Sequence, residues 1–250
     1  MLLRRVIEHV KAQNWTAVAL DFFIVVVGVF IGIQVANWNA ARALDNRAQQ
    51  SLIELGNDFT AIDSAAAELA TFYEGLINDL EALVRAVDAG EIDPENMDVI
   101  KAALAYGDVF ADPPPPSGTF RDLESSGNLT LIRNRDLRLR LIEYDQSLDN
   151  IIASDANINT MLVPFSAAFK RHVIFDPEYH LPETTDLAFQ DVRLPEASSV
   201  NVAAMLADPE FMTAAQQHLR LQIGRYINIR VSRSKIKQIR DMINQELESR

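Results

Sequence analysis

The pattern closest to a catalytic motif in this sequence is Ser232-Arg233-Ser234-Lys235, which matches S-x-x-K. In penicillin-binding proteins and related enzymes this pattern carries a nucleophilic serine, and S-D-N and K-T-G motifs accompany it. Both companion motifs are missing from this sequence. Because so short a pattern arises often by chance, we interpret the four residues as part of a basic helix face and expect no enzyme activity.

A second candidate for chemistry is a cluster of possible cation ligands, Asp176, Glu178 and His180. These three residues fit no known ligand spacing, so we interpret them as a solvated loop and expect no metal and no cofactor. The sequence also lacks G-x-G-x-x-G, P-loop, H-E-x-x-H and EF-hand motifs. It contains no cysteine, which excludes disulfides, thiolate metal sites and cysteine catalysis.

The strongest feature of the sequence is an apolar span over residues 16–38. As a helix it would be about 34 Å long, enough to cross the ~30 Å hydrocarbon layer of a bilayer. Trp15 and Trp38 flank it, at the depth where indoles settle among lipid headgroups. More basic residues precede the span than follow it, which favours a cytoplasmic segment 1–15 and an extracytoplasmic remainder 39–250.

Three details of the span leave alternatives open. A cleaved signal peptide is disfavoured, since the apolar stretch exceeds the roughly 7–15 residues of a signal core. Gly28, Gly32 and Ala36 recur every four residues, which either marks a contact between membrane helices or reflects the usual composition of such helices. Asp21 either lies at headgroup level or serves a proton or an ion, and its position near Trp15 favours the first interpretation.

The remainder of the chain is acidic. The net charge of the whole chain is −12. Residues 1–15 carry a charge of +2 and Asp21 carries −1, so residues 39–250 carry a net charge of −13. Nucleic-acid binding requires a basic face, so we expect no nucleic-acid partner. The length after the span suits one large domain or two small ones.

Three long helices are expected after the span, over about 39–89, 134–173 and 209–248. Apolar residues of the first recur at alternating intervals of three and four, the spacing of a coiled-coil seam, and no breaker separates this helix from the span. The second has the same spacing, with Asp155 as a polar intruder and Pro164 as an expected kink. The third has a rougher seam, which runs Leu219, Ile223, Tyr226, Ile236, Ile239, Ile243 and Leu247.

The predicted fold is therefore all-α: an N-terminal transmembrane helix that continues into an elongated, coiled-coil-like helical bundle. The first long helix is acidic and the third is basic, which favours their pairing over binding of the basic stripe to anionic lipid or to a partner protein. Asp155 is expected to set the bundle register by hydrogen bonding to Arg230 or Arg233. Alternatively, it lines a ligand pocket.

Two irregular stretches, 94–133 and 175–208, interrupt the bundle. The run 113–116 consists of four prolines, which must be extended and stiff and can serve as a spacer or as a ligand for a groove. Ser117 or Thr119 is expected to cap a short helix that Gly127 closes, followed by an extended piece over 128–132.

In the second stretch we expect one helix, over 197–207. It lies between a proline-interrupted segment and the Asp208-Pro209 pair, which is typical of a helix start.

Two segments carry longer motifs. The span opens with Asp21 and exits through Q-x-x-N-W-N at 34–39, and residues 119–138 match TFxxLxxSGxLxLIxNxxLR. These motifs resemble an uncharacterised family of bacterial single-span envelope proteins. The resemblance implies a Gram-negative-type envelope protein with a helical outer part and no known catalytic residue. The matching positions of the second motif are Thr119, Phe120, Leu123, Ser126, Gly127, Leu129, Leu131, Ile132, Asn134, Leu137 and Arg138.

We therefore expect a non-enzymatic, single-pass protein of the bacterial inner membrane, with its N-terminus cytoplasmic and its bulk periplasmic. Its partners would be membrane lipid and either further copies of itself or the other subunits of an envelope complex, for which it would be a scaffold or accessory subunit. The alternative is a helical sensor that binds a ligand near Asp155 or in the 175–208 loop and signals through a partner. The signature element 119–134 would brace the long helices or simply seal the tip of the bundle.

Overall fold

The structure is a computed structural model that describes residues 15–177 and 197–249, and the chain divides into two units, Met1–Ser51 and Leu52–Arg250. Helix α2 (Trp15–Ala89) belongs to both, since it begins in the first unit and supplies the first long helix of the second. It ends where Gly90 adopts a φ of +74°, a left-handed conformation that favours glycine. The predicted helix over 39–89 is therefore present.

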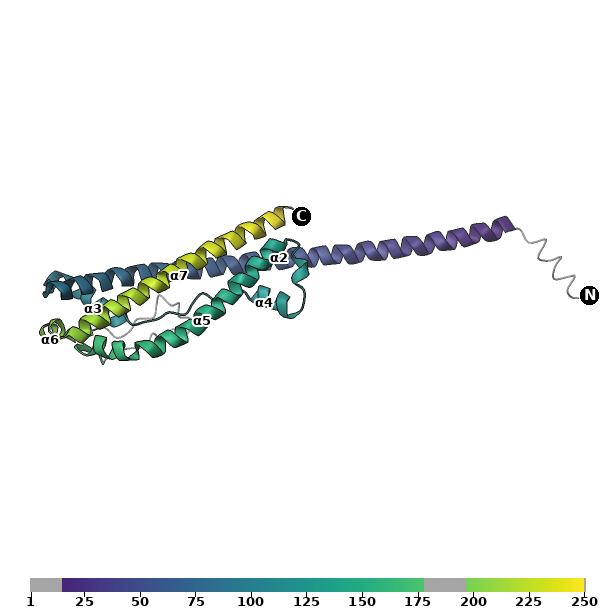
Figure 1. The fold of residues 1–250 in the computed structure, drawn as a ribbon. Helices are drawn as coiled ribbons and strands as arrows, with labels where there is room; N and C mark the ends of the chain where they lie inside the picture. Colours follow the sequence, from purple (N-terminus) through teal and green to yellow (C-terminus); the bar gives the residue numbers. More distant parts are fainter. Residues whose placement is uncertain (1–14, 178–196, 250) are drawn as a thin grey trace, which may run out of the picture. The chain divides into compact units, whose positions relative to one another are not determined.

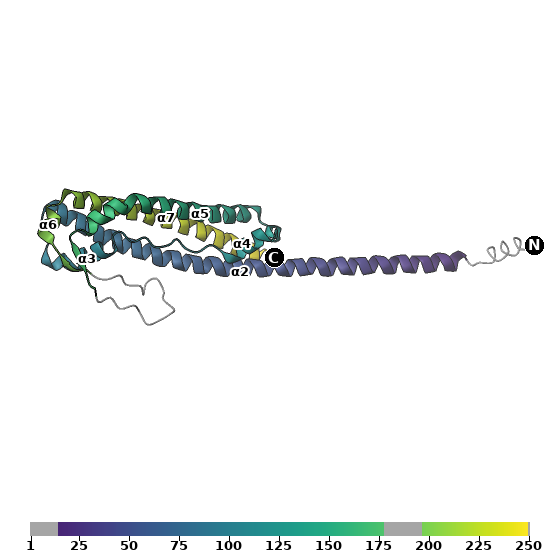
Figure 2. The ribbon, with the colours of Figure 1, turned by 90° about the horizontal axis from the view of Figure 1, so that it is seen from below.

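The second unit is built on three long helices: the part of α2 from Leu52 onward, α5 (Arg135–Lys170) and α7 (Pro209–Glu248). These helices lie side by side in both ribbon views (Figures 1 and 2). Asn134 caps α5 and Asp208 caps α7, each by accepting hydrogen bonds from backbone N–H groups of the first turn. α5 continues through Pro164 and curves along its length (Figure 1).

The predicted seam of α2 is buried along its whole length, which confirms the core face of this helix. Coiled-coil geometry stays a prediction. The buried seam residues are Leu52, Leu55, Phe59, Ile62, Ala66, Leu69, Tyr73, Leu76, Leu80, Leu83 and Val87.

These residues belong to two core clusters. The first core cluster joins α2 at 52–66 to the start of α5 and the end of α7. The second core cluster joins α2 at 69–87 to the end of α5 and the start of α7. Within this unit, α2 and α5 therefore run parallel, and α7 runs antiparallel to both.

The irregular stretch 94–133 contains the 3₁₀ helices η1 (Pro94–Asn96) and η2 (Leu129–Leu131) and the α-helices α3 (Met97–Tyr106) and α4 (Gly118–Ser125). An extended segment that contains the four prolines connects α3 to α4, and buried Ala111 shows that it packs on its own bundle. The expected extended piece over 128–132 is wrong, because η2 forms a turn there that directs Ile132 into the first core cluster.

The expected helix over 197–207 is only half right. Residues at its start form strand β2 (Ala197–Val200), which pairs antiparallel with β1 (Val173–Phe175), and α6 (Val202–Leu206) follows. The β-branched and aromatic residues of β1 favour a strand, and the Ser198 hydroxyl donates a hydrogen bond to the carbonyl of Ile174. The all-α prediction therefore holds for a mostly helical fold with two short strands.

Candidate functional site

The first candidate surface is the apolar part of α2 in the first unit. From Phe22 onward, this helix is long and apolar enough to cross a membrane, and none of its apolar window is buried. Phe22 is 71% exposed and Val35 is 51% exposed, and exposed apolar side chains lie on all sides of this part of the helix. Water solvates such a surface poorly, so it requires lipid or a protein to cover it.

The predicted small-residue stripe lies on this surface. A Cβ atom built at Gly28 or Gly32 would meet no atom within 4 Å, so both positions are open to a second helix. Trp38 is exposed, and the guanidinium of Arg42 lies 5.5 Å from its ring centroid. The side chains of Trp15 and Asp21 lie outside the described residues.

The second candidate surface is the signature element, residues 119–134. A carboxylate of α2 accepts hydrogen bonds at the start of this element. Asp58 accepts hydrogen bonds from the Ser117 hydroxyl, at 2.8 Å, and from the Thr119 N–H, at 3.0 Å. Ser117 is the residue that caps α4, since its hydroxyl accepts from the N–H of Phe120. An acidic group at a helix N-terminus also interacts favourably with the helix dipole.

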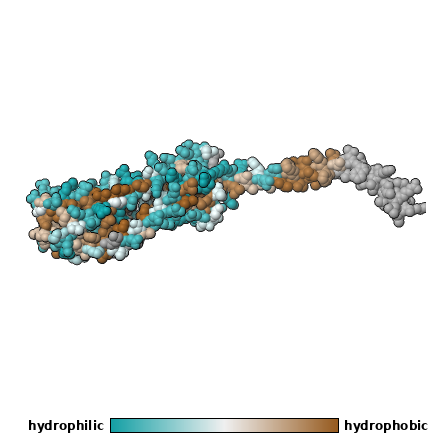
Figure 3. Space-filling view, viewed as in Figure 1, coloured by the Kyte–Doolittle hydropathy of each residue, from teal (hydrophilic) through white to brown (hydrophobic). Residues whose placement is uncertain are grey.

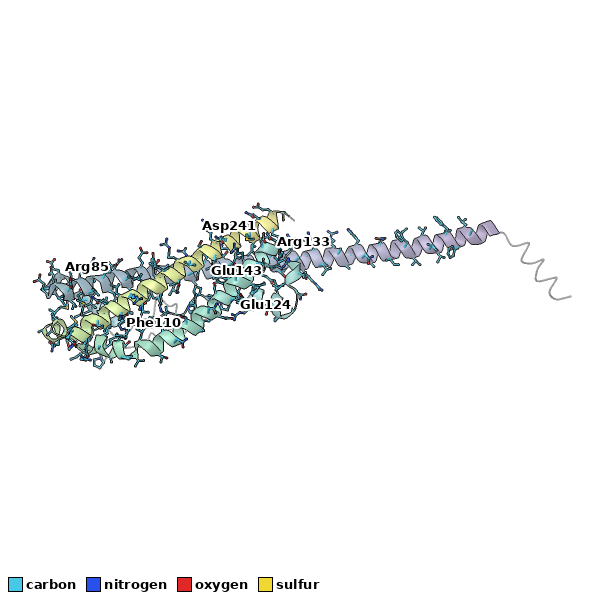
Figure 4. The ribbon with its side chains drawn as sticks, in the orientation of Figure 1. Arg85, Phe110, Glu124, Arg133, Glu143 and Asp241 are labelled. Atoms are coloured by element: carbon cyan, nitrogen blue, oxygen red, sulfur yellow. The ribbon has the colours of Figure 1, made fainter. Side chains whose placement is uncertain are left out.

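A carboxylate of α7 holds the other end of the same element. Glu246 is buried and accepts hydrogen bonds from the N–H groups of Arg133, at 2.8 Å, and Asn134, at 3.2 Å. Arg133, labelled in Figure 4, marks the point where the element joins α5. The element is therefore attached to α2 at one end and to α7 at the other.

The signature positions between these two attachments have structural roles. Gly127 has a φ of +73° and, with Asn128, closes α4 by hydrogen bonds to the carbonyls of Glu124 and Leu123. The Ser126 hydroxyl donates to the carbonyl of Asp122. Phe120 and Leu123 are buried in the first core cluster, and Leu129 packs against it.

The third candidate surface lies on α7, whose predicted seam packs in or against the core except at Ile223. Ile223 was expected in the core but is 36% exposed, whereas His218 and Gln222 are fully buried. The side-chain amide of Gln222 donates to the carbonyls of Gly107, at 2.9 Å, and Val109, at 3.0 Å. These contacts satisfy carbonyls after the end of α3 and explain why α7 directs Gln222 inward.

The same region contains a partly buried ion pair. Lys170 lies 2.9 Å from Asp108 and also donates to the carbonyls of Leu104 and Ala105. The His218 ring lies 4.8 Å from the ring of Phe169. Burial lowers the pKa of His218, while the nearby Asp108 carboxylate raises it by a smaller amount.

A cavity of about 570 Å³ lies between α5 and α7. Among its described lining residues, the charged ones are Arg220 and Arg225. Arg225 also stacks its guanidinium 4.1 Å from the ring centroid of Phe110, which lies on the segment between α3 and α4 and is labelled in Figure 4. The apolar lining residues are Ile151, Ile158, Leu162, Phe165 and Leu221.

The side chain of Asp155 lies outside the described residues, so its hydrogen bond to Arg230 or Arg233 stays a prediction. The two arginines expected to bind it have other contacts: Arg233 lies 3.4 Å from Asp63, and Arg230 donates to the hydroxyl of Tyr226 at 3.0 Å. Arg240 also binds Asp63, at 2.6 Å. The predicted charge pairing of α2 with α7 is therefore present at Asp63.

The S-x-x-K pattern at 232–235 and the cluster of possible cation ligands at 176–180 form no catalytic or metal site in the part of the chain that the structure describes. Ser232 is buried against α2, beside a void of only about 30 Å³. Glu178 and His180 lie outside the described residues, and within 15–177 and 197–249 no three His, Asp or Glu side chains gather to hold a metal ion.

Sequence reasoning did not identify Asp58, Glu246, His218 or Gln222. Comparisons with protein-family models, curated proteins and solved structures find no match to this chain.

Proposed function

We propose that this chain is a non-enzymatic, single-pass membrane protein that acts as a scaffold or accessory subunit of a bacterial envelope complex. Residues 1–15 would lie in the cytoplasm and the second unit in the periplasm. The observation that carries the proposal is the apolar surface of α2, which is exposed in every direction over residues 20–38. Figure 3 shows this surface as a continuous brown band.

The second unit supports a binding role rather than a catalytic one. Four of its buried or partly buried polar side chains bind backbone groups of the fold: Asp58 and Glu246 bind N–H groups, and Lys170 and Gln222 bind carbonyls. Groups that are committed to the fold in this way are poorly placed to act on a substrate. We therefore assign the unit to interaction with other proteins.

Protease treatment of spheroplasts tests the topology. The second unit should be degraded in intact spheroplasts, and the anchored remnant should resist extraction by alkaline carbonate. Protection of the second unit, or release of the whole protein by carbonate, would contradict the proposal.

Disulfide crosslinking tests self-association, because the native chain contains no cysteine. Gly32→Cys should form a crosslinked dimer in native membranes if the small-residue stripe is a helix contact. Phe30→Cys, which lies on the opposite side of the same helix, is the matched control. Equal crosslinking at both positions would indicate random collision rather than a defined contact.

One observation favours the alternative of a ligand-binding sensor, namely the cavity between α5 and α7. Its volume of about 570 Å³ falls within the range of small-molecule sites, roughly 300–1,000 Å³. Thermal-shift screening of the detergent-solubilised protein with metabolites and divalent ions would reveal such a ligand.

A further inference from the structure

We propose that the cavity between α5 and α7, together with an apolar stripe beside it on α7, binds an acidic amphipathic helix of a partner protein. The stripe consists of Ile223, Ile227 and Val231. This inference rests on the proposed function, since it names the surface and the kind of partner through which the second unit would join a complex.

The stripe lies on the exposed face of α7. Ile227 is 53% exposed and Val231 is 52% exposed, while His218 and Gln222 on the same helix are fully buried. α7 also buries apolar residues, but exposing β-branched residues while an imidazole and an amide are buried opposes what solvation favours at these positions. The contacts of Gln222 explain the buried side, and a covering partner would explain the exposed side.

The stripe and the cavity form one surface. The three stripe residues each follow a cavity-lining residue of α7 by three positions, and residues three apart are neighbours on a helix surface. Those lining residues are Arg220, Gly224 and Asn228. α5 supplies the opposite wall through Ile158 and Phe165. Figure 3 shows brown areas among polar ones on the face of the second unit that carries these helices.

The size of this surface favours a helix over a small ligand. A small molecule could fill the cavity but would leave the stripe uncovered. The stripe recurs every four residues over about 12 Å, which matches two turns of a partner helix. Gly224 lines the cavity beside the stripe, and a Cβ atom there would meet no atom within 4 Å, so this position is open to close approach.

Charge favours an acidic partner over a second copy of this chain through the same surface. Arg220 and Arg225 line the cavity, and Arg230 lies exposed near the stripe. A two-fold contact between two copies of this surface would bring arginines of both copies together, which is repulsive. Acidic residues flanking the apolar face of a partner helix would instead attract them.

Two synthetic peptides test the inference on the full-length protein in phosphatidylcholine nanodiscs. Both are 18-residue amphipathic helices with the same leucine stripe, one with glutamates and one with lysines on its polar face. At low salt, fluorescence anisotropy should show that the glutamate peptide binds at least tenfold more tightly than the lysine peptide. Empty nanodiscs provide the background. Equal binding of both peptides, or binding of neither, would overturn the inference.

Three variants locate the binding site. Ile227→Asp should weaken binding of the glutamate peptide at least tenfold, and Arg220→Glu should reverse the preference between the two peptides. Ile53→Asp changes an isoleucine of α2 that is 41% exposed, and it should leave binding unchanged. Binding that is insensitive to Ile227→Asp would place the peptide elsewhere and overturn the inference.

A photoreactive amino acid at position 227 tests the occupant in native membranes. A crosslinked polypeptide of a different mass that is lost with Arg220→Glu supports the inference. An adduct of twice the chain mass, a lipid or small-molecule adduct, or no adduct overturns it. These results are separable from the topology experiment, since release of the protein by carbonate would reject the anchor and leave the peptide measurements intact.

Discussion

The two core clusters of the second unit contain the same three helices but bury different chemistry. The first core cluster is apolar inside, and its carboxylates, Asp58, Asp63 and Glu246, lie at its edge, where they bind N–H groups and arginines. Beside the apolar residues of the second core cluster, α7 buries His218 and Gln222. Polar contacts therefore add to hydrophobic packing in setting the rotation of α7 beside the second core cluster, where Phe211, Ala214, Ala215 and Ile229 are also buried.

The consequence is visible on the outer surface of α7. Beside the first core cluster, Ile236, Ile239 and Ile243 are buried as their spacing predicts. Beside the second, Ile223 and Ile227 lie outside because Gln222 is directed inward. The same helix thus follows its apolar pattern at one end and departs from it at the other.

Truncation of an aromatic residue in the first core cluster should have the largest effect. Phe59 is fully buried and packs edge-to-face on Tyr144, with ring centroids 5.3 Å apart. Phe59→Ala should lower the free energy of unfolding by about 3–5 kcal/mol, measured by chemical denaturation in detergent micelles. Phe30→Ala removes an exposed phenylalanine of the apolar span and should leave the unfolding of the second unit unchanged.

Removal of the carboxylate that binds the start of α5 should have the next largest effect. Glu246→Ala leaves the N–H groups of Arg133 and Asn134 without their acceptor, which should cost about 2–3 kcal/mol. Amide hydrogen exchange should also accelerate over 128–138. Glu248→Ala, at an exposed position two residues further on, is the control, and an equal loss in both variants would reject the assigned role.

Two glycine-to-alanine substitutions test how tightly the second core cluster is packed. A Cβ atom at Gly107 would lie 2.8 Å from side-chain atoms of Leu80 and Phe169, so Gly107→Ala should cost about 1–3 kcal/mol. Gly75 lies inside α2, where a Cβ atom would meet nothing within 4 Å. Gly75→Ala should therefore stabilise the unit by about 0.5–1 kcal/mol in the same denaturation assay.

The buried histidine predicts a pH dependence. Because burial lowers the pKa of His218, the unfolded chain takes up a proton at a higher pH than the folded chain does. The contribution to stability is complete above pH ~6.5 and is lost as the pH falls from there toward the lowered pKa, with a slope of at most about 1.4 kcal/mol per pH unit. His218→Gln should remove this part of the slope, and an unchanged pH profile would contradict the prediction.

The smallest effect is expected from the hydroxyl of Tyr144. This group is buried and has no hydrogen-bond partner among the described residues, and burial raises the pKa of Tyr144. Tyr144→Phe should leave the free energy of unfolding unchanged or raise it by up to about 1 kcal/mol, as measured by denaturation. A large loss would show that the first core cluster also depends on an interior polar contact.

The sequence predicts the long helices and the caps well because those signals are local. The seam of α2, the Asp208-Pro209 start and Gly127 at the end of α4 are each fixed by neighbouring residues. Leu219 and Tyr226 pack against the second core cluster as predicted, but Ile223 does not. The burial of Gln222 in its place was not predicted, because the partners of Gln222 lie more than a hundred residues earlier, in the segment after α3. Glu246 and Asp58 were missed for the same reason, since a single carboxylate in a helix gives no indication of the distant N–H groups it binds.

The antiparallel pairing of α2 and α7 determines how the second unit would respond to mechanical load. The second unit begins at Leu52 and α7 ends at Glu248, and both residues adjoin helix segments of the first core cluster. Force applied between these residues would peel α7 from α2 one turn at a time, beginning with the packing of Ile243 and the ion pair of Arg240 with Asp63. Force applied between Leu52 and Lys170 would instead shear the parallel helices α2 and α5, and optical tweezers should record a higher rupture force for that geometry.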